Sequence, residues 1–147
     1  MSPKIVYTAG VFDLFHEGHL ELLEESKKLG DMLIVGVITD QGCFDYKGKY
    51  PKVRFSARMR IVQSIKEVDA AVTQYGTDPS DVLRSLTALG LKPFCMTHGD
   101  DWTRLKEGNE TLEELGIELK LIPRTTGEST SRLVSKIQGV QQLNILT

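Results

Sequence analysis

The chain has 147 residues, of which 40% are hydrophobic, and this favours a single domain with a buried core. A formal net charge of −2 argues against the basic surface that is typical of nucleic-acid-binding proteins. No apolar run approaches the roughly 20 residues of a membrane span, and no signal-peptide pattern is present. Cys43 and Cys95 suggest no disulfide framework, so we expect a reduced, cytoplasmic protein.

The first third of the chain alternates apolar runs with a helical pattern. Residues 5–9 are typical of a buried strand, and residues 20–30 repeat apolar side chains at helical spacing up to a glycine. Residues 32–38 form a continuous apolar run of the kind buried in parallel sheets. Residues 41–54 contain two glycines, a proline and four basic side chains, so we predict a long surface loop there.

The same alternation continues through the rest of the chain. Ser56 is expected to cap a helix that runs to about Ile65. The later pattern predicts strands at 69–73, 93–97 and 117–122, and helices at 78–89, 109–115 and 129–137. Residues 139–147 are predicted to be a frayed C-terminal tail.

This order predicts an α/β fold, with a five-stranded parallel sheet and helices on both faces, in one domain over residues 1–138. In such sheets, ligands bind beyond the carboxyl ends of the strands. Three polar stretches, residues 13–19, 98–102 and 124–132, each follow a predicted strand. We therefore expect all three stretches to line one crevice.

Two histidines lie at the turn between the first strand and the first helix. His16 and His19 are three residues apart, with Gly18 between them, so both imidazoles share one face of the first helical turn. A helix N-terminus also presents unpaired N–H groups and the positive end of the helix dipole. The pair therefore predicts a phosphate-binding site.

Three motifs carry a resemblance to a known family. Residues 10–19, Gly-Val-Phe-Asp-Leu-Phe-His-Glu-Gly-His, resemble the H-x-G-H signature of the nucleotidyltransferase superfamily. Residues 99–102, Gly-Asp-Asp-Trp, and 124–131, Arg-Thr-Thr-Gly-Glu-Ser-Thr-Ser, resemble the paired motifs of cytidylyltransferases, closest to the glycerol-3-phosphate type. The resemblance covers residues 4 to about 137, and it implies that residues 1–138 form a Rossmann-like nucleotide-binding catalytic domain.

The resemblance implies transfer of CMP from CTP to a small phosphorylated alcohol, with glycerol 3-phosphate expected first, or to a phosphonate. The products would be a CDP-linked molecule and pyrophosphate. The acceptor's own oxygen would attack the α-phosphorus, while the protein supplies position and charge. A Mg²⁺ ion is expected to bind mainly through the triphosphate, without a metal site of the protein. The resemblance also implies a homodimer.

Residue roles follow from the same resemblance. It implies catalytic roles for His16, His19, Lys47 and Arg124. Lys47, with Lys49 as the weaker candidate, would also contact the acceptor. The nucleotide would lie against a wider set of residues: Gly10, Val11, Phe12, Asp13, Gly18, Arg58, Asp69, Gly99, Asp100, Trp102, Ser129 and Thr130. Structural roles stay open for several of these, among them helix capping by Ser129, a strand edge at Asp69 and packing by Trp102.

Two departures from the family pattern leave the acceptor open. Glu128 stands where the family has a small apolar residue, and His98 precedes the Gly-Asp-Asp-Trp motif as it does in phosphonate-activating relatives. The main alternative is an ATP-dependent adenylyltransferase of the same superfamily, such as one that makes FAD. A non-catalytic nucleotide-binding module is the alternative from another class. A zinc site is disfavoured, because no His or Cys spacing matches a zinc template.

Overall fold

Five parallel strands form the centre of the protein in the computed structural model, which describes residues 2–100, 104–125, 127 and 129–146. The strands lie in the order β3-β2-β1-β4-β5. Their bounds are β1 Ile5–Gly10, β2 Met32–Ile38, β3 Ala70–Gln74, β4 Cys95–Gly99 and β5 Glu118–Ile122. The helices are α1 Glu17–Lys27, α2 Asp40–Lys47, α3 Phe55–Gln63, α4 Ser80–Ala88, α5 Asn109–Leu115 and α6 Thr130–Leu146.

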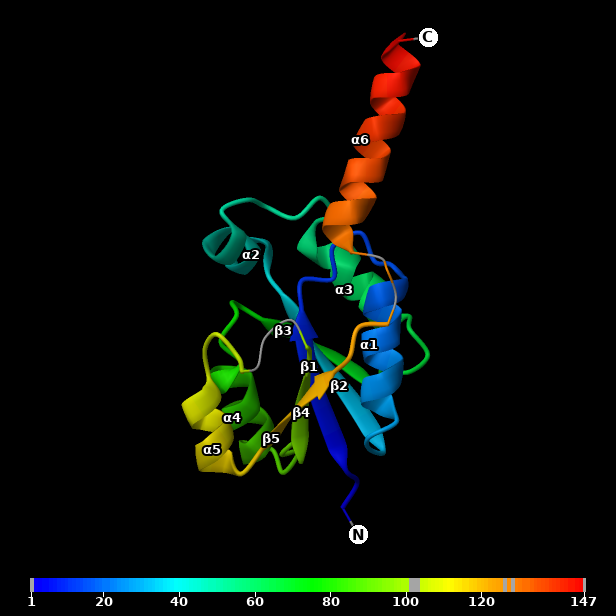
Figure 1. Cartoon of the computed structure of the whole chain (residues 1–147). Helices are drawn as coiled ribbons and strands as arrows, with labels where there is room; N and C mark the ends of the chain where they lie inside the picture. Colours follow the sequence, from blue (N-terminus) through cyan, green and yellow to red (C-terminus); the bar gives the residue numbers. More distant parts are fainter. Residues whose placement is uncertain (1, 101–103, 126, 128, 147) are drawn as a thin grey trace.

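Helices cover both faces of the sheet, as Figure 1 shows. On one face, Leu23 of α1 and Val62 of α3 pack against Val35 and neighbouring apolar residues of the sheet. On the other face, Leu83 of α4 and Leu112 of α5 pack in a cluster with other residues of the sheet. Apolar side chains on both sides of each central strand explain the continuous apolar run at residues 32–38. The predicted α/β fold is confirmed.

The segment predicted as a loop at residues 41–54 begins with a helix instead. Thr39 caps α2 by accepting a hydrogen bond from the Gly42 N–H (3.0 Å), and Gly48 ends the helix in a left-handed conformation at φ 75°. The loop prediction therefore holds only for the residues after Gly48. The helix was missed because it is eight residues long and largely polar on its exposed side, so its periodicity is weak.

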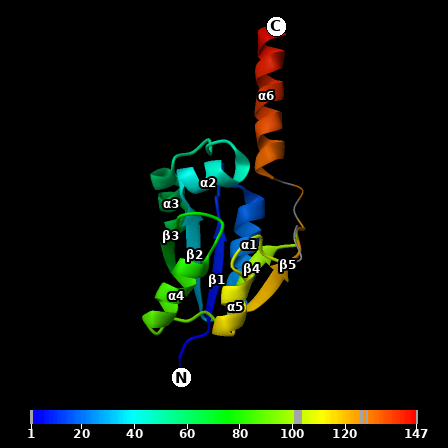
Figure 2. The ribbon, with the colours of Figure 1, turned by 90° about the vertical axis from the view of Figure 1, so that its left-hand side faces the viewer.

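The C-terminal segment also differs from the prediction. The helix expected at 129–137 continues as α6 to Leu146, through residues that were predicted to be a frayed tail. Figures 1 and 2 show that only its N-terminal part lies against the domain, while the rest extends away from it. Among the described residues, no helix is long and apolar enough to cross a membrane.

Smaller differences concern where elements begin. Helix α3 begins at Phe55, with Arg54 at the capping position, so Ser56 lies in its first turn. Both cysteines are buried free thiols.

The sheet topology fixes where a ligand can lie. From β1 at the centre, the chain builds β2 and β3 outward on one side and then crosses to β4 and β5 on the other. The loops that leave β1 and β4 therefore diverge at the carboxyl end of the sheet, which opens a crevice between them.

Candidate active site

Two neighbouring pockets occupy the crevice at the carboxyl end of the sheet. The first, which we call the histidine pocket, has a volume of about 360 Å³ and contains His16, Gly99 and Ser129 in its lining. The second, the tyrosine pocket, has a volume of about 240 Å³ and contains Tyr46 and Gln74. Ligand sites in parallel α/β sheets are expected at this location.

The two pockets share part of their lining. The shared polar side chains come from four separate parts of the chain: His19, Lys47, His98, Arg124 and Thr130. We call these five residues the shared wall. A molecule in either pocket would therefore face the same imidazole, ammonium and guanidinium groups.

His16 and His19 are held by an unusual turn. Phe12 and Leu14 both have positive φ, 55° and 48°, which non-glycine residues seldom adopt and which strained functional turns often contain. The His16 Nδ1 accepts a hydrogen bond from the Gly18 N–H (3.0 Å), and the His19 Nδ1 accepts one from the His16 N–H (3.2 Å). Both rings therefore cap α1 through Nδ1, while the His16 Nε2 lies 3.5 Å from the Thr130 hydroxyl oxygen.

Burial, followed by the neighbouring His16, Lys47 and Arg124, lowers the pKa of His19 to about 3. Burial acts in this direction because it disfavours the charged imidazolium, and the nearby cations add to the effect. The neutral ring accepts a proton poorly but can donate from Nε2, because its Nδ1 already accepts the His16 N–H. His19 is therefore suited to donate to a phosphate oxygen rather than to act as a base.

The N-terminus of α6 is fastened to the same turn. The Thr130 hydroxyl donates to the Asp13 carbonyl oxygen (3.0 Å) and lies 3.5 Å from the His16 Nε2. The Ser129 Oγ accepts from the Arg132 N–H (3.1 Å), so Ser129 caps the helix. Two helix N-termini, those of α1 and α6, thus border the histidine pocket, which favours an anion there.

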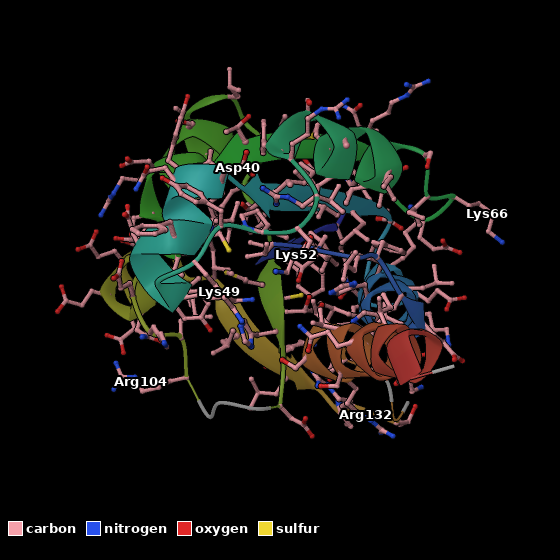
Figure 3. All side chains as sticks on the ribbon, turned by 90° about the horizontal axis from the view of Figure 1, so that it is seen from above. Asp40, Lys49, Lys52, Lys66, Arg104 and Arg132 are labelled. Atoms are coloured by element: carbon pink, nitrogen blue, oxygen red, sulfur yellow. The ribbon has the colours of Figure 1, made fainter. Side chains whose placement is uncertain are left out.

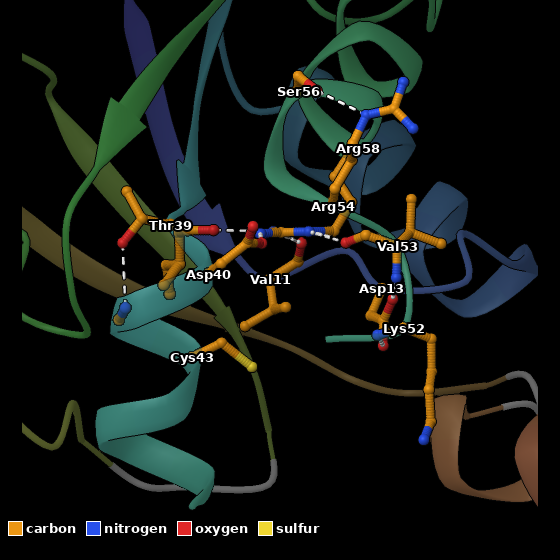
Figure 4. A network of polar contacts seen from close by, with 12 residues as sticks. Val11, Asp13, Thr39, Asp40, Cys43, Lys52, Val53, Arg54, Ser56 and Arg58 are labelled. Carbon is orange, nitrogen blue, oxygen red and sulfur yellow. Dashed lines mark hydrogen bonds and ion pairs between the residues drawn. The ribbon is translucent and has the colours of Figure 1, made fainter. Parts of the chain in front are cut away.

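Arg58 has a different place from the one expected. Its side chain is fully buried, and its guanidinium donates to the carbonyl oxygens of Val11, Ile38 and Val53 and to the Asp40 carboxylate (2.7 Å). Figure 4 shows that this one group joins the turn after β1, the start of α2 and the loop before α3. Its donors are committed inside the protein, which corrects the expectation that Arg58 faces the phosphates.

Asp13 belongs to the same network. Its two carboxylate oxygens accept from the N–H groups of Lys52 and Val53, at 2.8 and 2.9 Å. The residue does line the tyrosine pocket, but its charge is directed at the backbone of the loop. The carboxylate thus holds the segment after α2 against the turn after β1.

Asp69 lies away from the crevice. Its carboxylate accepts from the Leu33 N–H (2.8 Å) and pairs with the Lys27 ammonium (2.6 Å), at the amino ends of β2 and β3. Ligands bind at the opposite edge of such a sheet. This position corrects the expected nucleotide contact and agrees with the alternative of a structural role at the strand edge.

The other expected nucleotide contacts divide between the pockets. Gly10, Val11 and Phe12 line the tyrosine pocket, while Gly18 lines the histidine pocket. The Asp100 N–H continues the sheet by donating to the Ile122 carbonyl (3.1 Å), and the residue lines neither pocket. Trp102 and Glu128 lie outside the described residues.

Lys49 lines neither pocket of the crevice. It borders a third pocket of about 450 Å³ between the loop after α2 and the first turns of α6, together with Lys52. Figure 3 shows the two lysines from above, near the middle of this end of the molecule. Lys47 and Thr130 also line this third pocket, so it adjoins the shared wall, but Lys49 itself does not belong to that wall.

Tyr46, Gln74 and Lys106 are among the lining residues of the tyrosine pocket that were not singled out from the sequence. Gln74 ends the edge strand β3, and its buried amide joins Tyr7 and Gly76. Tyr46 directly precedes Lys47, for which a catalytic role is predicted, and this neighbour is the signal in the sequence that could have pointed to Tyr46. Lys106 lies in a polar loop whose composition gives no such signal.

The described residues offer no group of three or more His, Cys, Asp or Glu side chains placed to hold a metal ion. The Asp13 carboxylate, which comes from the turn at the crevice, already accepts two backbone N–H groups. The polar side chains of the shared wall are donors and cations rather than carboxylates.

Known proteins resemble the chain over nearly its whole length. Residues 7–138 match the family described as cytidylyltransferase-like. The bifunctional protein HldE of Desulfatibacillum aliphaticivorans is 38% identical over 140 residues, and that of Gluconobacter oxydans is 34% identical over 140 residues. Each alignment covers 94% of this chain but 28% of the relative, so the chain spans less than a third of these proteins.

A solved structure supports the same assignment. The lipopolysaccharide core biosynthesis protein from Thermoplasma volcanium is 30% identical, with a TM-score of 0.65. That comparison covers 86% of this chain and 100% of the other. Sequence and fold agree, and the chain belongs to the cytidylyltransferase-like family.

Proposed function

We propose that the protein transfers a nucleoside monophosphate from a nucleoside triphosphate to the phosphate of a small acceptor, with release of pyrophosphate. The observation that carries the proposal is the shared wall, in which His19, Lys47 and Arg124 line two adjoining pockets. A reaction between two phosphorylated substrates needs such a boundary, because the attacking oxygen of the acceptor must reach the α-phosphorus of the nucleotide.

The histidine pocket suits the triphosphate. It is bordered by the N-termini of α1 and α6, and it combines their positive dipole ends with the imidazoles and Arg124. The tyrosine pocket then remains for the acceptor. In this division, the triphosphate and the acceptor phosphate reach the shared wall from different pockets.

In the proposed step, an oxygen of the acceptor phosphate forms a bond to the α-phosphorus of the nucleotide. The bond from that phosphorus to the bridging oxygen breaks, and its electron pair leaves with pyrophosphate. The acceptor phosphate is already an anion, so no base is needed. Donors fixed in advance by the turn, among them the His19 Nε2, would stabilise the charge that builds on the α-phosphate.

We also propose that a magnesium ion accompanies the triphosphate. The oxygen ligands that Mg²⁺ prefers come mainly from phosphates in sites of this kind. The donor and cationic groups of the shared wall would contact the remaining phosphate oxygens. The ion would neutralise phosphate charge, while the residues of the chain position the two substrates.

The acceptor is inferred to be a sugar phosphate. The solved relative is named for lipopolysaccharide core biosynthesis, and the core of lipopolysaccharide is built from sugars. The relatives reported above fit the ATP-dependent alternative better than CTP with glycerol 3-phosphate. We therefore propose ATP and a sugar phosphate as the pair to test first.

A pyrophosphate-release assay tests the proposal. ATP, CTP, GTP and UTP are each combined with glucose 1-phosphate, mannose 1-phosphate, glycerol 3-phosphate, phosphocholine, phosphoethanolamine and a simple phosphonate, with Mg²⁺ present. We expect release with ATP and a sugar phosphate, and its loss in Lys47→Met. Release with CTP and glycerol 3-phosphate alone would favour the other interpretation. No release from any pair would contradict the proposed function.

The predicted homodimer stays a prediction that sedimentation equilibrium would test. A protein that remains a monomer at micromolar concentration would contradict it. The assay above does not depend on this outcome.

A further inference from the structure

Two lysines flank one aromatic ring in the tyrosine pocket. The Lys106 ammonium lies 4.1 Å from the centroid of the Tyr46 ring, and the Lys47 ammonium lies 5.8 Å from it. Contacts of this length fall within the range of cation–π attraction. Tyr46 and Lys47 end helix α2, while Lys106 comes from the segment between β4 and α5. Tyr46 thus holds together two positive charges from distant parts of the chain.

The two lysines differ in which pocket they reach. Lys47 lines both pockets, whereas Lys106 lines the tyrosine pocket and is absent from the histidine pocket. Lys106 therefore marks the acceptor side of the crevice, and Lys47 lies at the boundary where the two substrates would meet.

The acidic side chain that lines the tyrosine pocket is directed at the backbone of the chain. Asp13 is the acidic side chain among its lining residues, and both its oxygens accept backbone N–H groups. The Gln74 amide is committed to Tyr7 and Gly76. Met96 and Leu105 add apolar surface to the lining of the pocket. A ligand that suits this lining has an anionic end for the lysines and a compact body for the rest.

We infer that Lys106 and Lys47, held by Tyr46, form the binding site for the phosphate of the acceptor, and that the sugar lies deeper, over Leu105 and Met96. This inference rests on the proposed function, since it names how the acceptor of that reaction is bound. Two phosphates that approach each other repel, and a pair of ammonium groups on the acceptor side offsets that repulsion. Lys106 is thus a substrate-binding residue that acts on the acceptor and not on the nucleotide.

Isothermal titration calorimetry tests the inference with glucose 1-phosphate, inorganic phosphate, ATP and CTP as separate probes. The variants are Lys106→Met and, as a matched control, Lys66→Met. Lys66 is an exposed lysine at the periphery of the molecule (Figure 3), with its side chain 91% exposed. Both replacements remove one positive charge and keep an unbranched chain, so the net charge of the two variants is equal.

We expect Lys106→Met to bind glucose 1-phosphate about tenfold or more weakly, as the loss of one charge-assisted hydrogen bond predicts. Its affinity for the nucleotide should change less than twofold, and Lys66→Met should match the unmodified protein with every probe. The same split should appear in kinetics, with a raised KM for the acceptor and an unchanged KM for the nucleotide.

Three results would overturn the inference: unchanged binding of glucose 1-phosphate, an equal loss for nucleotide and sugar phosphate, or no binding of either phosphate probe by the unmodified protein. Failure of the proposed function looks different. In that case no pair releases pyrophosphate, although Lys106→Met still binds glucose 1-phosphate and inorganic phosphate more weakly while its affinity for the nucleotides is kept.

Discussion

The imidazole rings of His16 and His19 stack with their centroids 3.8 Å apart, and the His19 Nδ1 accepts a hydrogen bond from the His16 N–H. The capping role and the proposed phosphate contact use different nitrogens of the same ring. Nδ1 holds the turn, and Nε2 is the donor. The two roles can therefore be separated by substitution.

Replacing His19 by Asn should keep the capping role and remove the donor to the phosphate. The Asn oxygen lies near the position of Nδ1 and can accept the His16 N–H, but it offers nothing at Nε2. We expect near-normal stability and a loss of about 10²-fold or more in kcat, as for removal of a transition-state donor.

His19→Gln is the complementary variant, because its amide lies near Nε2. It should keep more activity than His19→Asn while losing about 1 kcal/mol of stability with the cap. Pyrophosphate release and urea unfolding measure the two quantities. Equal effects of both variants on activity would show that Nε2 has no separate role.

The lowered pKa of His19 predicts a dependence of stability on pH. Above pH 6.5 the imidazole is neutral in both the folded and the unfolded chain, so it contributes nothing there. Between pH 6.5 and about 3 the unfolded chain binds a proton that the folded chain does not, so stability falls with decreasing pH. The slope from this group is at most about 1.4 kcal/mol per pH unit. Urea unfolding from pH 8 to 4 should show it, and His19→Asn should remove it.

Arg58→Met should destabilise the protein strongly. The change leaves three carbonyl oxygens and the Asp40 carboxylate without their donor, and breaking a buried charge network of this kind costs about 3–5 kcal/mol. Arg54→Met is the control, because Arg54 is exposed and donates to Ser56 at the surface. Thermal or urea unfolding compares them. Similar stabilities for the two variants would contradict the assigned role of Arg58.

Gly36→Ala should displace Tyr7 and, through it, Gln74, which lines the tyrosine pocket. A Cβ atom there would lie 1.9 Å from the Tyr7 hydroxyl oxygen, which donates to the Gln74 amide oxygen at 2.5 Å. We expect a loss of about 1–3 kcal/mol from overpacking, with weaker binding in the tyrosine pocket. Gly76→Ala is the control, since no atom lies within 4 Å of its added Cβ. A Gly36→Ala protein as stable as the control would show that the sheet can move to accept the methyl group.

The sheet could be predicted because its signal is local. Residues 32–38 are apolar without interruption, and a strand buried on both faces needs that pattern wherever it lies in the fold. The turn that carries His16 and His19 was predictable for the same reason, since strand, motif and helix follow one another directly.

The role of Arg58 could not be predicted from local pattern. An arginine in the first turn of a helix looks suited to a phosphate, and its burial depends on carbonyl groups from three other segments. Asp69 begins the strand predicted at residues 69–73, so its place at the amino end of the sheet follows from the sequence, and the expected nucleotide contact rested on the resemblance alone. Lys106 and Tyr46 meet only through tertiary structure, so no spacing between them carries a signal.

The bonds from Asp13 to the loop after α2 have a consequence for hydrogen exchange. The amides of Lys52 and Val53 lie in a segment without helix or strand, yet they donate to a carboxylate of the turn after β1. Their exchange with solvent requires that loop and turn separate, so they should open as one unit. Slow, matched exchange at these two amides would report directly on the integrity of the turn after β1, even in a variant that no longer turns over substrate.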